Sequence, residues 1–378
     1  MKKIVYIVGG LLAPNGMSSV LSGKINYLAE HTDYELYMVL TEKAGVPWYY
    51  HINEKVKWVN FDINFDELDT MPIYKKFFFY TLKQRRYKHK LTEYLMSVRP
   101  DITVSALRRE INFINDIPDG SKKVGEIHFD RTYYRQFNKP YLPAALNRAI
   151  TRYWVKGLVS NLQRLERFIV LTHEDEAHWP EVERKMVIPN SLPNFPVEQA
   201  LLAEKSVIAA GRYSWQKGFD LLISAWSIVA NRHPDWKLNI YGAGDHSAYQ
   251  QMADEKGLAD KVCCHPPVDN IYEKYLESSI FVLSSRYEGF GLVLAEAMSA
   301  GLPAVSFACP CGPSDIISDG RDGLLVEKEN VPALAEAICR LIEDGNMRRQ
   351  YGKAAKENMH RYEQENIMQQ WIQLFESL

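Results

Sequence analysis

The chain alternates short apolar runs with segments of helix length, and this alternation limits its fold more than any other feature. In the second half, strand-length runs lie at 206–210, 237–241, 262–264, 280–284 and 304–307. Helical patterns separate or follow them at 219–231, 247–256, 271–277, 292–300 and 331–343. The first half shows the same alternation, with apolar runs at 4–8, 34–40, 102–105, 123–127 and 168–171. Its first helix is predicted over 18–31. Strands that alternate with helices in this way predict βαβ units and parallel sheets.

The length of 378 residues predicts two domains. Three prolines within residues 189–196 mark a break, which we interpret as the linker. We therefore expect an N-terminal domain over 1–190 and a C-terminal domain over 191–361, with a helix at about 362–378 packing back onto the first; the whole ending from Gly352 to Leu378 reads as helical. Two facing, doubly wound Rossmann-like domains of this kind bind ligands in the cleft between them.

The composition is that of an ordinary globular protein, with 46% hydrophobic and 24% charged residues. No apolar run approaches the length of a membrane-spanning helix, so we expect a cytoplasmic protein. The five cysteines form no C-x-x-C pair, which favours reduced thiols over a zinc site.

The net charge of −2 hides an asymmetry between the two halves. Residues 1–190 carry 28 Lys and Arg against 22 Asp and Glu (+6), and the remainder carries 17 against 25 (−8). Residues 75–90 hold seven Lys and Arg, five aromatic residues and no acid. Such a segment is either a solvated helix with an ordinary buried stripe or a contact with an anionic membrane surface. Nucleic-acid binding is the weakest alternative, because the second half is acidic and no nucleic-acid motif is present.

The segment from Glu288 to Glu296 places two carboxylates eight positions apart around a Gly-Phe-Gly turn. A strand precedes the turn and a helix follows it, so the helix offers unpaired N–H groups and the positive end of its dipole to an anion. Carboxylates beside such a site suit the hydroxyl groups of a sugar. An acidic first helical turn with no ligand is the simpler alternative for this spacing taken alone.

A second loop, Ala210 to Asp220, presents Arg212 and Lys217 between two glycines. Arginine supplies a fork and lysine a point charge, which together suit a diphosphate, although a basic surface loop would look similar. The turn at 240–245 and the loop at 265–270, with Pro266 and Val268, follow the next two strands; two prolines in that loop fix the backbone. Further turns lie at 309–315 and 319–326.

These motifs resemble the signatures of retaining, family-4 nucleotide-sugar glycosyltransferases, in order, from about Val207 to Val326. The resemblance implies the GT-B fold and transfer of a hexose or N-acetylhexosamine from a nucleotide-diphosphate sugar, most simply a UDP-sugar. It implies that Glu296 binds the ribose, that Glu288 faces the transferred sugar, and that the backbone N–H groups of 290–292 meet donor oxygens (Phe290, Gly291 and Leu292). Pro266 and Val268 would lie at the base. Arg212 and Lys217 would neutralise the diphosphate, so no metal is expected.

Fewer residues of the first half match motifs of this family. Asn15-Gly16 matches the glycine pair of the family's first loop, with Asn as an αL-tolerant replacement, and Gly16 would approach the donor. His128, after a strand, matches a histidine near the transferred sugar. The acceptor would be lipid-linked or a polysaccharide, as in capsule or O-antigen synthesis, and the protein peripheral at the inner face of the membrane. Tyr133, Tyr134, Tyr153 and Trp154 could stack on its sugar rings.

Three other functions compete. A glycoside hydrolase also uses two carboxylates, but it has no need of Arg212 and Lys217. An NAD-linked oxidoreductase needs a G-x-G-x-x-G spacing that Gly9 to Gly16 does not supply. A non-catalytic nucleotide- or glycan-binding module of the same fold stays open.

Overall fold

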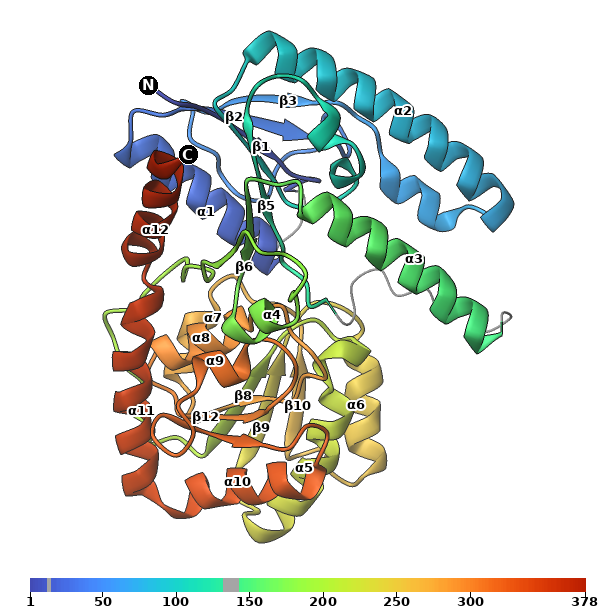
Figure 1. Ribbon diagram of the computed structural model, residues 1–378. Coiled ribbons are helices and arrows are strands. Elements are labelled where there is room, and N and C mark those ends of the chain that lie inside the picture. Colours follow the sequence, from blue (N-terminus) through green and yellow to red (C-terminus); the bar gives the residue numbers. More distant parts are fainter. Residues whose placement is uncertain (12–14, 132–142) are drawn as a thin grey trace. The chain divides into compact units, whose positions relative to one another are not determined.

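The computed structural model describes residues 1–11, 15–131 and 143–378, which divide into two compact units (Figure 1). The first unit comprises 1–171, 176–191 and 367–378, and the second comprises 172–175 and 192–366. Each unit is built on its own sheet, and every strand pairing in both sheets is parallel.

The sheet of the first unit has the strand order β3-β2-β1-β4-β5-β6-β7. Its strands are β1 (Lys3–Ile7), β2 (Glu35–Leu40), β3 (Lys57–Asn60), β4 (Ile102–Ser105), β5 (Lys122–Glu126), β6 (Arg167–Val170) and β7 (Lys185–Val187). Residues 4–7 of β1 are at most 1% exposed, because helices cover both faces of the sheet at its centre.

The helices of this unit are α1 (Gly16–His31), α2 (Ile73–Val98), α3 (Ala144–Leu162) and α12 (Gln364–Ser377). On one face, Tyr87 and Leu91 of α2 and Leu158 of α3 share a core with Val5 and Ile7 of β1. On the other face, α1 and α12 meet, where the Lys24 ammonium lies 3.6 Å from the centre of the Trp371 ring. The chain thus returns to the first unit with its last helix.

The sheet of the second unit has the order β10-β9-β8-β11-β12-β13. Its strands are β8 (Ser206–Ala210), β9 (Lys237–Tyr241), β10 (Val262–His265), β11 (Ile280–Leu283), β12 (Ala304–Phe307) and β13 (Gly323–Val326). Its helices are α5 (Phe219–Arg232), α6 (His246–Glu255), α7 (Ile271–Leu276), α8 (Leu292–Ser299), α9 (Pro313–Ile316), α10 (Val331–Glu343) and α11 (Gly345–Met359). The short helix α4 (His173–Ala177) crosses the boundary between the units. Short 3-10 turns complete the structure at η1 (Phe65–Thr70), η2 (Glu110–Asn112), η3 (Ile114–Asp116), η4 (Trp215–Lys217) and η5 (His360–Tyr362).

The predicted class, two doubly wound Rossmann-like α/β domains, is confirmed. The predicted helical ending from Gly352 to Leu378 is present, and it consists of two helices, because η5 and Glu363 separate α11 from α12. The backbone of Glu363 is extended, with φ −55° and ψ 146°, so the chain turns there between two helices that pack on different units. No helix within the described part of the chain is both long and apolar enough to span a bilayer.

Candidate donor site

The loop between β8 and α5 carries Arg212 and Lys217 and lies against the end of β11. Gly218 has φ +61°, and a Cβ atom there would lie 2.1 Å from the carbonyl oxygen of Ser284. The Ser284 hydroxyl also donates to the carbonyl of Lys217 at 2.9 Å. Only glycine allows this approach of two backbones, and it brings Lys217 towards the loop that follows β11.

Lys217 reaches Glu288 directly. Its ammonium lies 2.6 Å from the Glu288 carboxylate, which also accepts a hydrogen bond of 2.6 Å from the Ser285 hydroxyl. The Lys217 and Glu288 side chains are 13% and 8% exposed, so water screens their charges weakly. Arg212 is exposed, and so the two predicted phosphate ligands differ: one is held in a buried ion pair, and the other is open to solvent.

The turn before α8 has the geometry of an anion site. Gly291 has φ +94° and precedes Leu292, the first residue of α8, so the first N–H groups of the helix have no partner within it. Phe290 is buried, its ring edge against Tyr362 with centroids 5.3 Å apart, and this contact anchors the turn. A Cβ atom on Gly312 would lie 1.8 Å from the carbonyl oxygen of Phe290, so a second loop closes over the same turn.

Glu296 lies on α8, where burial raises the pKa of its carboxyl from 4.5 to about 8, and the charge of Lys217 acts in the opposite direction. Its negative charge also contributes to the raised pKa values of Tyr272 and Tyr275, after burial in both cases. No side chain within the described ranges donates a hydrogen bond to the carboxylate of Glu296. This carboxyl therefore has acceptor capacity that a ligand can use.

Pro266 and Val268 lie in the exposed loop after β10. The loop starts from a fixed point, because the His265 ring stacks on Tyr241 with centroids 4.5 Å apart. The Tyr213 hydroxyl donates to the carbonyl oxygens of Ile240 and His265 at 2.7 and 3.1 Å. The loop is exposed, but its first residue is held firmly.

Arg286, which no sequence motif singled out, anchors the β8–α5 loop through contacts with Trp215 and Asp220. Its side chain is 8% exposed and forms a two-pronged ion pair with Asp220 at 2.9 and 2.6 Å, with a further contact to Glu329 at 3.1 Å. It also donates to the carbonyl of Trp215 at 2.6 Å, and its guanidinium lies 4.7 Å from the centre of the Trp215 ring. The only signal in the sequence was an arginine three residues after the end of a buried strand.

In the first unit, Asn15 is the N-cap of α1, and Gly16 is the first residue of that helix. The Asn15 side chain accepts a hydrogen bond of 2.9 Å from the N–H of Ser18, and its backbone is extended with φ −146°. Asparagine is therefore present as a helix cap. The left-handed conformation that a glycine replacement suggested is not the one it adopts.

His128 follows β5, but its side chain is only 3% exposed. Burial lowers its pKa from 6.5 to about 4, so the imidazole is neutral at pH 7. Neither ring nitrogen has a hydrogen-bond partner within the described residues, and Nε2 lies 3.4 Å from the Glu126 carboxylate. Glu126 in turn pairs with the buried Lys24 at 2.5 Å, and burial lowers the pKa of that lysine. His128 is thus part of a buried polar cluster of the first unit.

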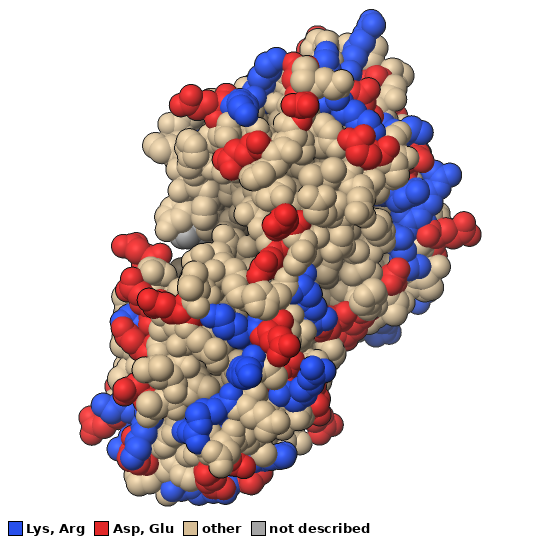
Figure 2. Space-filling model, turned by 90° about the vertical axis from the view of Figure 1, so that its left-hand side faces the viewer, with Lys and Arg blue, Asp and Glu red and all other residues tan. Residues whose placement is uncertain are grey.

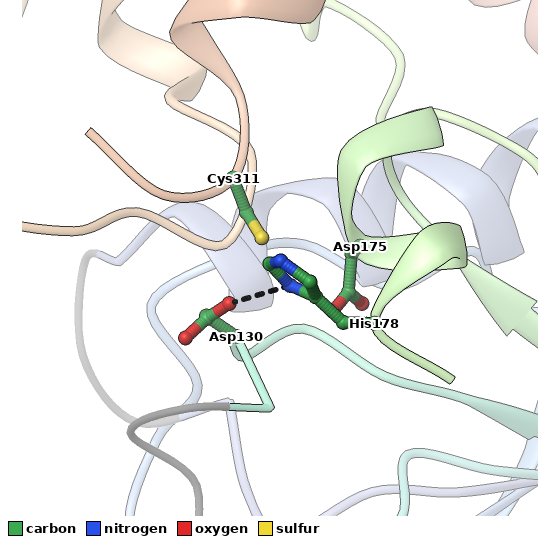
Figure 3. Close-up of side chains that lie close together, drawn as sticks. All are labelled: Asp130, Asp175, His178 and Cys311. Atoms are coloured by element: carbon green, nitrogen blue, oxygen red, sulfur yellow. Dashed lines mark ion pairs between the residues drawn. The ribbon is translucent and has the colours of Figure 1, made fainter. Parts of the chain in front are cut away.

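A second histidine of the first unit has a clearer partner. His178 Nδ1 lies 3.5 Å from the carboxylate of Asp130, which is 2% exposed (Figure 3). The neighbouring Arg131 forms a two-pronged ion pair with Glu181 at 2.7 and 2.8 Å. These contacts fix the start of the segment that follows β5. Tyr133 and Tyr134, which we predicted to stack on sugar rings, lie outside the described residues.

Residues 194–358 match the family model described as "Glycosyl transferases group 1". This part of the chain is therefore similar to the group 1 glycosyltransferases. Lys217, Glu288 and Glu296, together with Arg212 and the turn at 290–292, all lie within the matched residues.

Three curated relatives show where the sequence similarity extends. An exopolysaccharide phosphotransferase of Streptomyces coelicolor is 35% identical over 57% of this chain and 24% of its own length. A poly(ribitol-phosphate) alpha-N-acetylglucosaminyltransferase of Staphylococcus aureus is 30% identical over 59% of the chain and 46% of its length. The amylovoran biosynthesis glycosyltransferase AmsD of Erwinia amylovora is 31% identical over 54% and 61%. The chain thus covers less than two thirds of each of these relatives.

Solved structures match over the whole chain at low identity. Sucrose-phosphate synthase from Thermosynechococcus elongatus aligns with a TM-score of 0.81 at 18% identity, and the alignment covers 100% of this chain and 99% of the synthase chain. S. aureus TarM, in complex with fondaparinux, alpha-GlcNAc-glycerol and UDP, has 0.76 at 18%, covering 99% and 100%. Anabaena HepE with UDP and glucose has 0.71 at 17%, covering 100% of both. These likenesses establish that both domains have the fold of GT-B enzymes.

Proposed function

We propose that the protein is a retaining glycosyltransferase that transfers a hexose or N-acetylhexosamine from a UDP-sugar in the synthesis of a cell-surface glycan. The observation that carries this proposal is the arrangement of Lys217, Glu288 and Glu296 around the N-terminus of α8. A cation, an anion-binding helix end and two carboxylates match the three parts of a sugar nucleotide: diphosphate, sugar and ribose.

In this proposal the diphosphate binds between the α8 N-terminus and Lys217, with Arg212 closing on it from solvent. The Lys217–Glu288 ion pair sets the position of both side chains before the donor arrives, at 2.6 Å. Arg286 supports the same loop through its contact with Trp215. A site held in place before binding spends little of the binding energy on ordering side chains.

The chemical step follows from the charges. The bond between the anomeric carbon and the diphosphate oxygen breaks, and the acceptor oxygen forms its new bond on the same face of the sugar. The acceptor proton passes to the departing phosphate oxygen, so no protein base is needed. Lys217 and Arg212 stabilise the charge on the leaving diphosphate, and Glu288 stabilises the positive charge at the anomeric carbon. We expect the reaction to proceed without a metal ion, since these cations take that role.

The UDP assignment and the acceptor class draw on the relatives. Neighbouring structures hold UDP, and two relatives are named a poly(ribitol-phosphate) alpha-N-acetylglucosaminyltransferase and an amylovoran biosynthesis glycosyltransferase. We propose a lipid-linked or polysaccharide acceptor, presented at the inner face of the membrane.

The test is a binding panel of UDP, GDP, ADP and CMP by thermal shift and calorimetry, on wild type and Lys217→Ala. A ligand that binds only the folded protein raises the unfolding midpoint. We expect a shift with UDP that Lys217→Ala loses and that Lys237→Ala keeps, because Lys237 is an exposed lysine of the same unit, at the start of β9. Equal binding by wild type and Lys217→Ala would contradict the diphosphate assignment. UDP binding with no transfer from any UDP-sugar, in the presence of a membrane extract, would favour the binding module.

A further inference from the structure

The first three turns of α2 expose large apolar side chains to solvent. The exposed fractions are 72% for Tyr74, 78% for Phe77, 61% for Phe78, 39% for Phe79 and 44% for Leu82. Single exposed apolar residues are common on protein surfaces, but a cluster within nine consecutive residues marks a contact site. The buried contacts of α2, at Tyr87, Leu91 and Leu95, come later in the helix.

Helix α3 repeats this feature. Its Leu146, Tyr153 and Trp154 are 46%, 76% and 41% exposed, while Leu158 and Leu162 at its other end are buried in the core. In both helices, the C-terminal part packs on the sheet and the N-terminal part exposes apolar side chains.

The same helices are strongly basic. Helix α2 contains seven Lys and Arg and one Glu (+6), and α3 contains three Lys and Arg and no acid (+3). The face of the molecule drawn in Figure 2 carries Lys and Arg interspersed with Asp and Glu. Helices with a large excess of positive charge and exposed aromatic rings differ from such a mixed, ordinary solvated surface.

Several of these cations are not neutralised by the protein. Lys76 of α2 pairs with Asp69, and Lys83 pairs with Glu67; both acids lie in η1, before the helix. Lys75, Arg85 and Arg86 are exposed, and no described carboxylate lies within 4 Å of them. Arg148, Arg152 and Lys156 of α3 are likewise exposed and without an ion pair in the described part of the chain, and their spacing of four residues places them on one side of the helix.

The two helices belong to one surface. Both contribute to the core on the same face of the first sheet, and Figure 1 shows them on the same side of this unit. Asp116 connects them, with Lys88 of α2 at 3.7 Å and Arg164, just after α3, at 2.7 Å. We call the exposed residues 74–86 of α2 and 146–156 of α3 the basic–aromatic surface.

We propose that the basic–aromatic surface docks on a phospholipid bilayer with anionic headgroups. Cations on a helix attract anionic lipid, and aromatic and aliphatic side chains enter the interface between headgroups and acyl chains. A second copy of the chain would bring two surfaces of the same positive sign together, which electrostatic repulsion opposes. A nucleic acid would meet the cations but would leave the adjacent Phe77, Phe78 and Leu82 in water.

The choice of a bilayer rests on the proposed function, because an enzyme that uses a lipid-linked acceptor must reach it at the membrane surface. The docking surface and the donor site belong to different units of the chain. Vesicle binding and UDP binding can therefore succeed or fail separately, and the two proposals are tested independently.

The experiment is co-sedimentation of the full chain with vesicles of phosphatidylcholine, with and without phosphatidylglycerol, at low and high salt. We expect binding only to vesicles that contain phosphatidylglycerol, weakened by salt. Lys75→Gln, Arg85→Gln and Arg86→Gln combined should weaken binding by on the order of a hundredfold, from the usual contribution of three cations near an anionic surface. Phe77→Ser with Phe78→Ser should weaken binding as well and leave the salt dependence in place.

Matched controls separate this surface from charge and hydrophobicity in general. Lys237→Gln, Lys256→Gln and Lys353→Gln remove three exposed cations of the second unit, and Leu201→Ser removes an apolar side chain that is 85% exposed. These controls should bind vesicles as wild type does, and every variant should keep the wild-type unfolding midpoint and UDP affinity. Absence of wild-type binding to anionic vesicles, or an equal loss in the control variants, would overturn the proposal.

Discussion

The raised pKa of Glu296 makes donor affinity depend on pH in a way that can be calculated. With a pKa of about 8, the carboxyl of Glu296 is protonated in most molecules at pH 7. Ribose hydroxyls donate hydrogen bonds, and they do so more strongly to a carboxylate than to a carboxylic acid. A donor that binds only the ionised form must therefore displace the proton.

The size of the effect follows from the fraction of ionised protein. That fraction is about 0.01 at pH 6 and about 0.5 at pH 8, so the affinity should rise by about 50-fold over this range. At pH 7, binding should release about 0.9 proton for each donor molecule bound. The free energy of unfolding depends on pH with the opposite sign. The folded protein keeps the proton on Glu296 up to about pH 8, whereas the unfolded chain loses it above pH 4.5. The contribution of Glu296 to the free energy of unfolding is therefore complete below that pH and is lost as pH rises through about 8.

Calorimetry with a UDP-sugar tests the calculation, because the diphosphate of a UDP-sugar does not itself titrate between pH 6 and 8. Titrations in buffers of different ionisation enthalpy give the number of protons released. Glu296→Gln should flatten the pH dependence and remove the proton release. A wild-type affinity that is constant from pH 6 to 8, or a slope that survives in Glu296→Gln, would refute the ribose assignment or the raised pKa.

Three further outcomes follow from buried charges. Removal of either Lys217 or Glu288 alone should cost about 3–5 kcal/mol of unfolding free energy, because each change leaves a buried charge unpaired. In urea denaturation, the double variant Lys217→Met, Glu288→Gln should lose clearly less stability than the sum of the two single losses. Additive losses would mean that the two side chains are not coupled. Arg286→Lys should lose about 2–4 kcal/mol in the same assay, because lysine cannot make the two-pronged contact, and wild-type stability would contradict its anchoring role. The pKa of His128 lies below its usual value, so its contribution to stability should be complete above pH 6.5 and decline as pH falls towards 4. His128→Asn should reduce the loss of stability between pH 7 and pH 5, and an unchanged loss would show that His128 does not titrate in this range.

The second unit was predictable because its strands are short, apolar and regularly spaced. Strands β8, β9 and β12 and helix α10 have the predicted bounds. Strands β3 and β7 were overlooked, since both lie at sheet edges, where one side is solvated and the sequence keeps polar residues such as Lys57 and Lys185. The break between α11 and α12 has no glycine or proline to announce it.

The residues of the candidate site were likewise predictable only where they depend on local sequence. Residues that act through local chain geometry, such as Gly291 before α8, were visible in the sequence as a turn between a strand and a helix. The Arg286–Asp220 ion pair joins the loop after β11 to the first turn of α5, 66 residues apart in sequence, and no local pattern encodes it. The burial of His128 was equally hidden, because it depends on how α1 and the loop after β5 pack together.

The return of α12 to the first unit has a consequence for how the protein is made. Trp371 covers the ammonium of Lys24, and residues 367–378 complete a unit whose other segments end at Ser191. A ribosome releases these residues only after the whole second unit has been synthesised. The N-terminal unit therefore reaches its final packing last, and in the meantime a nascent chain must hold the apolar surface of α1 without its cover. A fragment that stops before residue 367 would leave the first unit incomplete, although all of the residues it lacks come from the far end of the sequence.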